Sequence, residues 1–117
     1  MSRAQDFVQK DIDVIDVEIS SGETTSDAVN LYGVTPVGFI LPAGMTSTQL
    51  SFEVSADNST FVSLVDMNNQ DVSYVIGSTA TAAHLDPNIF VGWKYIKFKA
   101  GSAEGADRTI KLMTYPV

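Results

Sequence analysis

The clearest candidate for a metal site is the polar stretch DMNNQD at 66–71, which begins like a calcium-binding loop. Oxygen-bearing side chains at its first, third and sixth positions are of the kind that calcium accepts as ligands. The pattern then departs from a calcium loop, since the sixth position is Asp71 where glycine is needed and the twelfth is Gly77 where a bidentate glutamate is needed. We therefore expect a polar hairpin loop without a metal ion.

Catalytic chemistry has few candidates in this chain. His84 is the single histidine and there is no cysteine, so a Ser-His-Asp arrangement could use no other base and thiol chemistry is excluded. In AAHLDP, His84 precedes a turn beside Leu85, which favours a structural or surface histidine. Acids are plentiful enough for a glycosidase pair, but a sequence does not show two carboxylates facing each other across a cleft. The glycines form neither GxGxxG nor GxxxxGK[ST], so we expect no enzyme and no cofactor.

Charge and hydropathy limit the possible partners. The net charge is −7, and residues 1–30 hold seven acids against two bases, so most of the acidity is N-terminal. Such a chain repels a phosphate backbone, and we do not expect nucleic-acid binding. No apolar run has the length of a signal peptide or a membrane span, so secretion and membrane insertion are not expected. The lack of cysteine fits a reducing cytoplasm.

A candidate protein interface lies in two segments near the C-terminus, WKYIKFK at 93–99 and RTIKLMTY at 108–115. Apolar and polar residues alternate in both, which predicts two paired strands with an apolar inner face. An outward stripe of Tyr and Met among cations has the composition of an interface. The alternative is a solubilising sheet face whose lysines protect an edge. The inward residues are Ile96, Phe98, Ile110 and Leu112, and the outward candidates are Tyr95, Lys97, Lys99, Lys111, Met113 and Tyr115.

The elements that would position these residues are strands. A period of two dominates the chain, and no long window shows the apolar stripe of a helix; at most one helical turn is expected, near 86–90. Eight or nine short strands with turn signals between them predict an all-β fold, an antiparallel, jelly-roll-like β-sandwich or a small barrel. The expected strands lie near 12–19, 28–33, 36–41, 49–56, 60–65, 72–76, 80–85, 94–100 and 108–115.

Two local patterns refine this prediction. In SFEVSADNSTFV at 51–62, alternation predicts that Phe52 and Val54 point to the core, and the DNS triplet supplies residues that tolerate a tight turn. In IDVIDVEI at 12–19 the alternation slips at Val14 and Ile15, which predicts a bulge or a strand that starts at Ile15.

The first residues lack the apolar pattern of a core. We expect residues 1–11 to form an N-terminal arm and residues 12–117 to form one β-sandwich domain. The arm is hypothesised to order only on assembly, against a neighbouring subunit or another protein. Its candidate contact residues are Asp6, Asp11 and Asp13 for basic groups, and Phe7 and Val8 for an apolar groove.

Residues 28–115 resemble small β-sandwich virion proteins of tailed bacteriophages. The likeness rests on VGFILPAGMTSTQLSFEVSADNSTFVSLVD at 37–66, where an LPA turn leads to a strand like LSFEVSADNSTF. It also rests on AAHLDPNIFVGWKYIKFKAGSAEGADRTIKLM at 82–113, where a DP…F-x-GW-[KR]-Y-[IL]-[KR] segment leads through a Gly/Ala-rich loop to DRTI. The N-terminal acidic stretch lies outside the likeness.

The resemblance implies a non-enzymatic head decoration or cement protein that binds the major capsid protein and stabilises the head. It implies a homotrimer on the outer capsid surface of the virion, made in the host bacterial cytoplasm. The alternatives are a tail or baseplate component and a carbohydrate-binding or adhesin module that contacts the host surface, because jelly-roll sugar-binding domains share the F-x-V-S-x-D turn. A sugar module usually exposes an aromatic platform, whereas Trp93 follows Gly92 in the apolar run IFVGW and is expected in the core.

Overall fold

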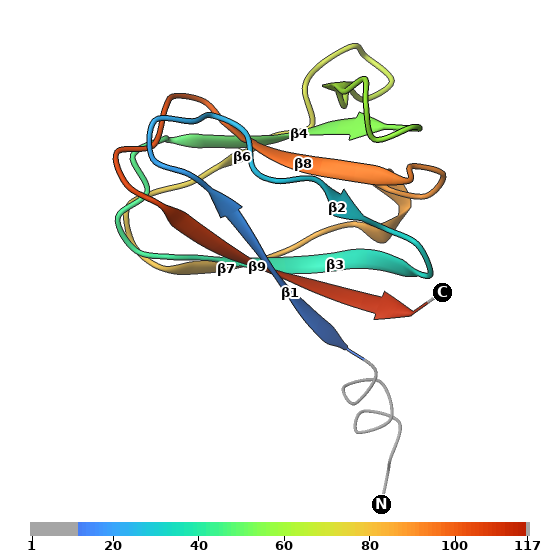
Figure 1. Ribbon diagram of the computed structural model, residues 1–117, viewed down its shortest axis with the longest axis horizontal. Coiled ribbons are helices and arrows are strands. Elements are labelled where there is room, and N and C mark those ends of the chain that lie inside the picture. Colours follow the sequence, from blue (N-terminus) through green and yellow to red (C-terminus); the bar gives the residue numbers. More distant parts are fainter. Residues whose placement is uncertain (1–11, 117) are drawn as a thin grey trace, which may run out of the picture.

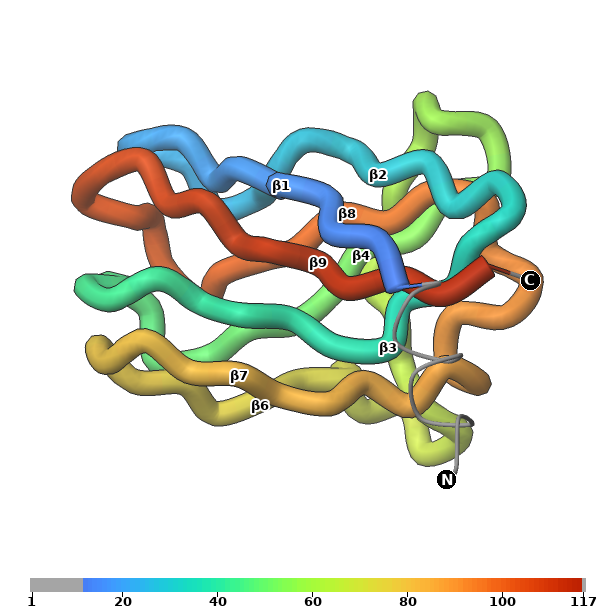
Figure 2. Tube along the Cα trace, turned by 90° about the horizontal axis from the view of Figure 1, so that it is seen from below, coloured from blue at the N-terminus to red at the C-terminus, as the bar shows by residue number. Residues whose placement is uncertain are grey.

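Two antiparallel sheets pack face to face in the computed structural model, which describes residues 12–116 (Figure 1). Figure 2 shows the strands of the four-stranded sheet side by side. In spatial order this sheet holds β1 (Asp13–Ile19), β9 (Arg108–Pro116), β3 (Val34–Leu41) and β7 (Thr81–His84). The five-stranded sheet holds β2 (Val29–Asn30), β8 (Tyr95–Ala100), β4 (Gln49–Ser55) and β5 (Val62–Ser63), and β6 (Tyr74–Val75) also pairs with β4.

The strand order is that of a jelly roll. The chain passes back and forth between the two sheets, so every strand of the four-stranded sheet has neighbours that are distant in sequence. When β5 and β6 are counted as one interrupted strand, eight strands form two interleaved sets of four, as in double Greek-key sandwiches. The predicted all-β, jelly-roll-like sandwich is confirmed. Within residues 12–116, no helix has the length and apolarity needed to cross a membrane.

The predicted helical turn is the 3₁₀ helix η1 (Pro87–Ile89). Asp86 caps it, because its carboxylate accepts a hydrogen bond from the Asn88 amide at 3.0 Å. Proline stands at the start of this turn, where its missing N–H is not needed. All nine expected strands are present, although β2, β5 and β6 are only two residues long.

Alternating side chains build the core as predicted. In β4, Leu50, Phe52 and Val54 are buried, and Phe52 lies opposite Phe98 of β8 in the ladder. The DNS turn after β4 is tight, since Asn58 has a φ of 60° and the Ser59 and Thr60 amides donate to the Asp57 carboxylate. These bonds lower the pKa of Asp57 from its ordinary value, with the Thr60 amide contributing most.

An aromatic cluster joins the two layers. Phe39 of β3 meets Phe98 of β8 edge to face, with ring centroids 5.9 Å apart. Phe52 of β4 contacts Phe98 at 5.4 Å and Phe90 at 5.2 Å, and Tyr74 contacts both Phe39 and Phe52. Edge-to-face and tilted ring pairs of this kind add stabilisation to the burial of the rings themselves. The cluster therefore packs the two sheets against each other.

The expected irregularity in the first strand is wrong. β1 starts at Asp13 and pairs with β9 in continuous register as far as Ile19, so it contains no bulge. The alternation of apolar and polar residues slips because Val14, an apolar residue, lies on the outward face of β1, which is otherwise acidic. Its side chain is 54% exposed. The bulge lies in β3, where the register shifts between Pro36 and Gly38. A proline is tolerated at such a site because it has no N–H to offer the ladder.

The expected pairing of the two C-terminal strands is also wrong. β8 belongs to the five-stranded sheet and β9 to the four-stranded sheet, so they lie in opposite layers. The loop 101–107 carries the chain from one layer to the other instead of closing a hairpin. This loop contains Glu104, whose side chain is fully buried although it is charged.

Glu104 holds three crossing connections together. Its carboxylate accepts hydrogen bonds from the Thr46 and Ser47 amides at 2.8 and 3.0 Å, which belong to the loop between β3 and β4. Arg108 donates to the same carboxylate from Nε at 2.9 Å. The backbone of Glu104 bonds the loop between β1 and β2, since its carbonyl accepts from Gly22 N and its amide donates to Glu23 O. A single buried residue thus joins three loops at one end of the sandwich.

Replacing Glu104 with glutamine is expected to lower the free energy of unfolding by about 2–3 kcal/mol at pH 7. The new amide group would face the Ser47 N–H, so two donors would oppose each other in a buried site. The measurement is urea unfolding followed by circular dichroism. Glu53→Gln is the control, because Glu53 lies 3.9 Å from a Lys99 ammonium that is 40% exposed, and we expect a loss below about 1 kcal/mol.

The loss should also depend on pH. Burial raises the pKa of Glu104, but hydrogen bonds from Thr46, Ser47 and Arg108 outweigh burial and hold the pKa below its ordinary value of 4.5. The stability supplied by the ionised carboxylate is therefore complete above pH 4.5 and is lost as pH falls through the lower folded-state value. The difference between wild type and Glu104→Gln should shrink in acid. A difference that is the same at pH 3 and pH 7 would contradict this account.

Candidate functional site

The outward stripe predicted near the C-terminus is divided between two faces. Tyr95, Lys97 and Lys99 lie on the outer face of the five-stranded sheet, and Lys111, Met113 and Tyr115 lie on that of the four-stranded sheet. The structure therefore does not bring the six residues together. Asp13 is exposed at the start of the edge strand β1. The arm residues Asp6, Phe7, Val8 and Asp11 lie outside the described residues.

The lysines of the stripe make local contacts. The Lys97 ammonium lies 4.4 Å from the centroid of the Phe61 ring, a cation–π geometry. Lys111 forms an ion pair with Asp16 at 3.1 Å, with both side chains more than half exposed. Neither β8 nor β9 is an edge strand, so the idea that these lysines protect an edge is wrong. They lie on the outer faces of central strands.

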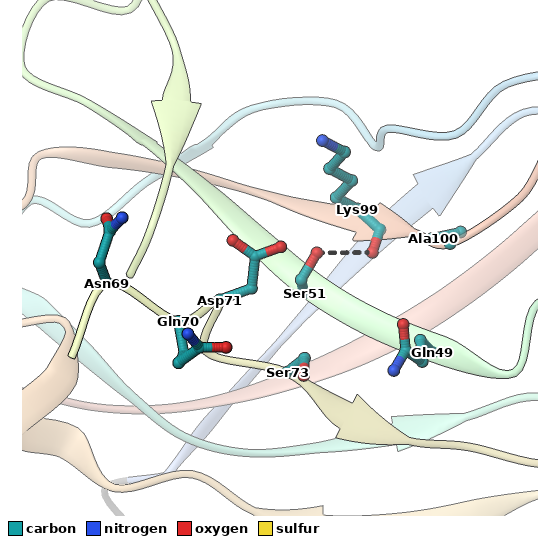
Figure 3. A pocket seen from close by; sticks show the side chains of 9 residues that line it. Gln49, Ser51, Asn69, Gln70, Asp71, Ser73, Lys99 and Ala100 are labelled. Atoms are coloured by element: carbon teal, nitrogen blue, oxygen red, sulfur yellow. Dashed lines mark hydrogen bonds between the residues drawn. The ribbon is translucent and has the colours of Figure 1, made fainter. Parts of the chain in front are cut away.

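A polar hollow of about 490 Å³ lies on the outer face of the five-stranded sheet (Figure 3). In Figure 3, Asp71 points toward Ser51, and the Ser51 hydroxyl donates to the Lys99 carbonyl at 3.4 Å. No three His, Cys, Asp or Glu side chains within residues 12–116 are arranged to hold a metal ion. The hollow is lined by Gln49, Ser51, Asn69, Gln70, Asp71, Ser73, Lys99, Ala100 and Gly101.

The DMNNQD loop forms one wall of the polar hollow, and it is closed as the predicted hairpin. Val65 and Asp71 form an antiparallel bridge across its base. The Asp66 carboxylate accepts hydrogen bonds from the Asn68 and Gln70 amides at 2.8 and 3.1 Å. These N–H groups surround the carboxylate with positive dipole ends, which suit an anion and oppose a cation. Asp66 therefore shapes the loop.

A second hollow, of about 430 Å³, lies at one end of the sandwich and is rich in aromatic residues. Trp93 is 39% exposed there, so the expectation that it belongs to the core is wrong. The turn before β8 explains this, because Phe90 enters the core while Gly92, at a φ of 95°, leads the chain outward to Trp93. We call this site the aromatic hollow; it is lined by Asn30, Leu31, Tyr32, Gly92, Trp93, Lys94 and Tyr95.

A third hollow, of about 320 Å³ and almost wholly apolar, lies on the outer face of the four-stranded sheet. Met113, Gly38 and His84 are neighbours across three strands of the ladder, and Gly38 leaves a depression between its neighbours. A Cβ atom at Gly38 would lie 3.0 Å from the Ala83 carbonyl oxygen, so a larger residue there would push β3 and β7 apart by a few tenths of an ångström. We call this site the apolar hollow; it is lined by Ile12, Val37, Gly38, Phe39, Ile40, Ala82, Ala83, His84 and Met113.

Sequence reasoning found part of these sites and missed part. Met113 and Tyr95 were candidates, and each lines a hollow. Ile40 was missed, although its position between buried Phe39 and Leu41 marks it as an apolar residue on an outward face. Tyr32 was missed because a tyrosine in a loop has no periodic pattern, and it is 91% exposed.

The fold defines the chain as a jelly-roll β-sandwich, and the polar, aromatic and apolar hollows lie on its surface. Among solved structures it is similar to the SPBc2 prophage-derived protein YomS, with a TM-score of 0.54 and 14% sequence identity over 88% of this chain and 93% of that chain. The similarity shows a shared fold. No family model matches the chain, and no curated protein matches it.

Calcium is expected to leave the stability unchanged. The Asp66 carboxylate is engaged by two backbone amides, so a cation would have to displace bonds that shape the loop. The thermal midpoint measured in 5 mM EDTA and in a small millimolar excess of calcium should agree within about a degree. A rise of several degrees in calcium, abolished by Asp66→Asn, would overturn this interpretation of the loop.

Proposed function

We propose that the chain is a non-enzymatic structural protein of a tailed phage particle, a decoration protein that binds the major capsid protein on the outer surface of the head. The observation that carries the phage context is the shared fold with the prophage-derived YomS over nearly the full length of both chains. The sequence likeness of residues 28–115 to virion β-sandwich proteins supports the same context. Synthesis in the bacterial cytoplasm fits a chain without cysteine.

The apolar hollow is the surface best suited to a capsid contact. Its lining is almost free of polar atoms, and Ile40 and Met113 lie on the outward side of central strands. Val14, 54% exposed, is the neighbour of Met113 across the ladder and extends the apolar area. Exposed apolar patches of this kind mark protein contact sites. The Lys111–Asp16 ion pair lies beside the area and supplies a polar rim.

The arm and the oligomeric state belong to the same proposal. Ile12 lines the apolar hollow, so residues 1–11 join the described chain at the edge of this surface. From that point Phe7 and Val8 would be within reach of a neighbouring subunit or of the capsid, with Asp11 and Asp13 available for basic groups. Arms exchanged between three copies would support a homotrimer at a threefold position of the shell.

The decoration role predicts a high copy number in the particle and a surface at which substitutions weaken particle binding. Quantitative mass spectrometry of purified particles should give hundreds of copies per particle, a ratio to the major capsid protein typical of a shell component.

The Ile40→Asp variant, added to particles that lack the protein, should bind at least tenfold more weakly than the wild type, because a charge would be buried against an apolar contact. The measurement is cosedimentation of particles with the purified variant.

Val62→Asp is the matched control, because Val62 is 58% exposed on β5 of the other sheet and its replacement should leave particle binding unchanged. Circular dichroism should show both variants folded. A few dozen copies or fewer would contradict the decoration role and favour a tail or baseplate component. Equal binding by both variants would exclude the apolar hollow as the contact.

A second function is favoured by one observation, the exposure of Trp93. A carbohydrate-binding or adhesin module needs exposed aromatic side chains, and Trp93 and Tyr95 both line the aromatic hollow. This role would use the aromatic hollow at the end of the sandwich instead of the outer face of the four-stranded sheet.

A further inference from the structure

We infer that the aromatic hollow binds a saccharide unit. The inference rests on the second proposed function, the carbohydrate-binding module, and names its site and ligand class. It does not depend on the capsid contact, because the two sites use different parts of the surface. Three aromatic residues from two separate segments line it: Tyr32 follows β2, Trp93 precedes β8, and Tyr95 is the first residue of β8. Figure 1 shows the connections that carry these residues at the same end of the molecule.

Backbone hydrogen bonds hold together the two segments that form the aromatic hollow. The Leu31 amide donates to the Lys94 carbonyl at 2.8 Å, which ties the two segments together, and Asn30 pairs with Tyr95 in the ladder. The Trp93 amide donates to the Phe90 carbonyl at 3.1 Å, at the end of the capped η1 turn. A ligand therefore meets segments whose backbone is already ordered, and little backbone entropy is lost on binding.

The chemistry of the lining suits a sugar ring. One face of a pyranose presents C–H groups with slight positive charge, and these pack against the negative face of an aromatic ring. The hydroxyls at the edge of the sugar need hydrogen-bond partners, which the tyrosine hydroxyls, the Trp93 indole and the Lys94 ammonium supply. The Asn30 side-chain oxygen accepts from the Tyr32 amide at 2.9 Å, so the NH₂ group is the part of this lining side chain that can donate to a ligand.

Size and polarity distinguish the aromatic hollow from a protein contact. Its volume of about 430 Å³ lies within the range of small-molecule sites, ~300–1,000 Å³. Its exposed lining is polar and apolar in equal parts, whereas the apolar hollow is almost free of polar surface. A flat protein partner would fill such a concave, half-polar site poorly. One or two sugar rings present the same mixture of apolar faces and polar edges.

The single tryptophan makes the test direct. Trp93 is the sole tryptophan of the chain, so intrinsic fluorescence excited at the indole reports on this hollow. The purified protein is titrated with glucose, galactose, N-acetylglucosamine, rhamnose and glucuronic acid, and with β-1,4-linked disaccharides of the first three. At least one of these should shift the Trp93 emission saturably in the millimolar range or below, as expected for a small ligand with few contacts.

Variants then assign the signal to the site. Tyr32→Ala should weaken binding of that sugar at least tenfold without loss of folding, because Tyr32 is 91% exposed and supports no core contact. Tyr115→Ala is the control on β9 of the other sheet, and it should bind as the wild type does. Calorimetry with the wild type, Trp93→Ala and Tyr95→Ala gives a readout that does not need the fluorophore.

Two results would overturn the inference. The first is a panel in which no sugar changes the emission or gives heat, or in which Tyr32→Ala binds as the wild type does. The second is a Trp93 emission shift on addition of decoration-free particles that Tyr32→Ala abolishes while sugars have no effect. That result would assign the aromatic hollow to a capsid protein. The Ile40→Asp experiment is unaffected by either outcome, so failure of the capsid proposal and failure of the saccharide site are distinguishable.

Discussion

The buried carboxylate of Glu104 is the interaction on which the arrangement of the two sheets depends. A jelly roll requires the chain to cross between layers repeatedly, and each crossing leaves backbone polar groups that no ladder satisfies. The Glu104 carboxylate satisfies such groups in the loop between β3 and β4, and the Glu104 backbone satisfies others in the loop between β1 and β2. Glu104 itself belongs to a third crossing loop, 101–107. The loop between β6 and β7 joins the same end, since the Gly44 amide donates to the Ser78 carbonyl at 2.7 Å.

This concentration of bonds gives the two ends of the sandwich different roles. At the Glu104 end the connections bond mainly to one another, and a substitution there affects the fold as a whole. At the opposite end the connections are held by a few backbone bonds, such as Leu31 to Lys94, and the side chains of Tyr32 and Trp93 are left at the surface. The fold is therefore stabilised at the Glu104 end, and surface side chains at the opposite end can be replaced with less effect on it.

The fold was largely predictable from sequence, because alternation in a strand is a local property. The buried positions of Phe52, Phe98, Ile110 and Leu112 follow from a period of two, and so do the strand positions. The assignment of β8 and β9 to different sheets was not predictable in this way. It depends on which distant groups a buried glutamate meets, and a Gly/Ala-rich loop is equally compatible with a hairpin.

The candidate sites were less predictable for a related reason. A hollow forms where residues from separate segments meet. The topology therefore decides that Ile40 and Met113 line one hollow and that Tyr32 and Trp93 line another. The placement of Trp93 was mistaken because an apolar run does not show which of its rings, Phe90 or Trp93, enters the core. The local turn geometry decided it.

The pairing of β1 with β9 has a mechanical consequence. Asp13 lies opposite Thr114, so residues 12 and 116 emerge side by side from the same end of neighbouring antiparallel strands. A force that pulls these two points apart would load the ladder one rung at a time, from the open end toward Ile19 and Arg108. Bonds loaded in sequence yield at lower force than bonds loaded together. Tension through the termini would therefore peel β1 away from the sheet while the Glu104 end remained intact.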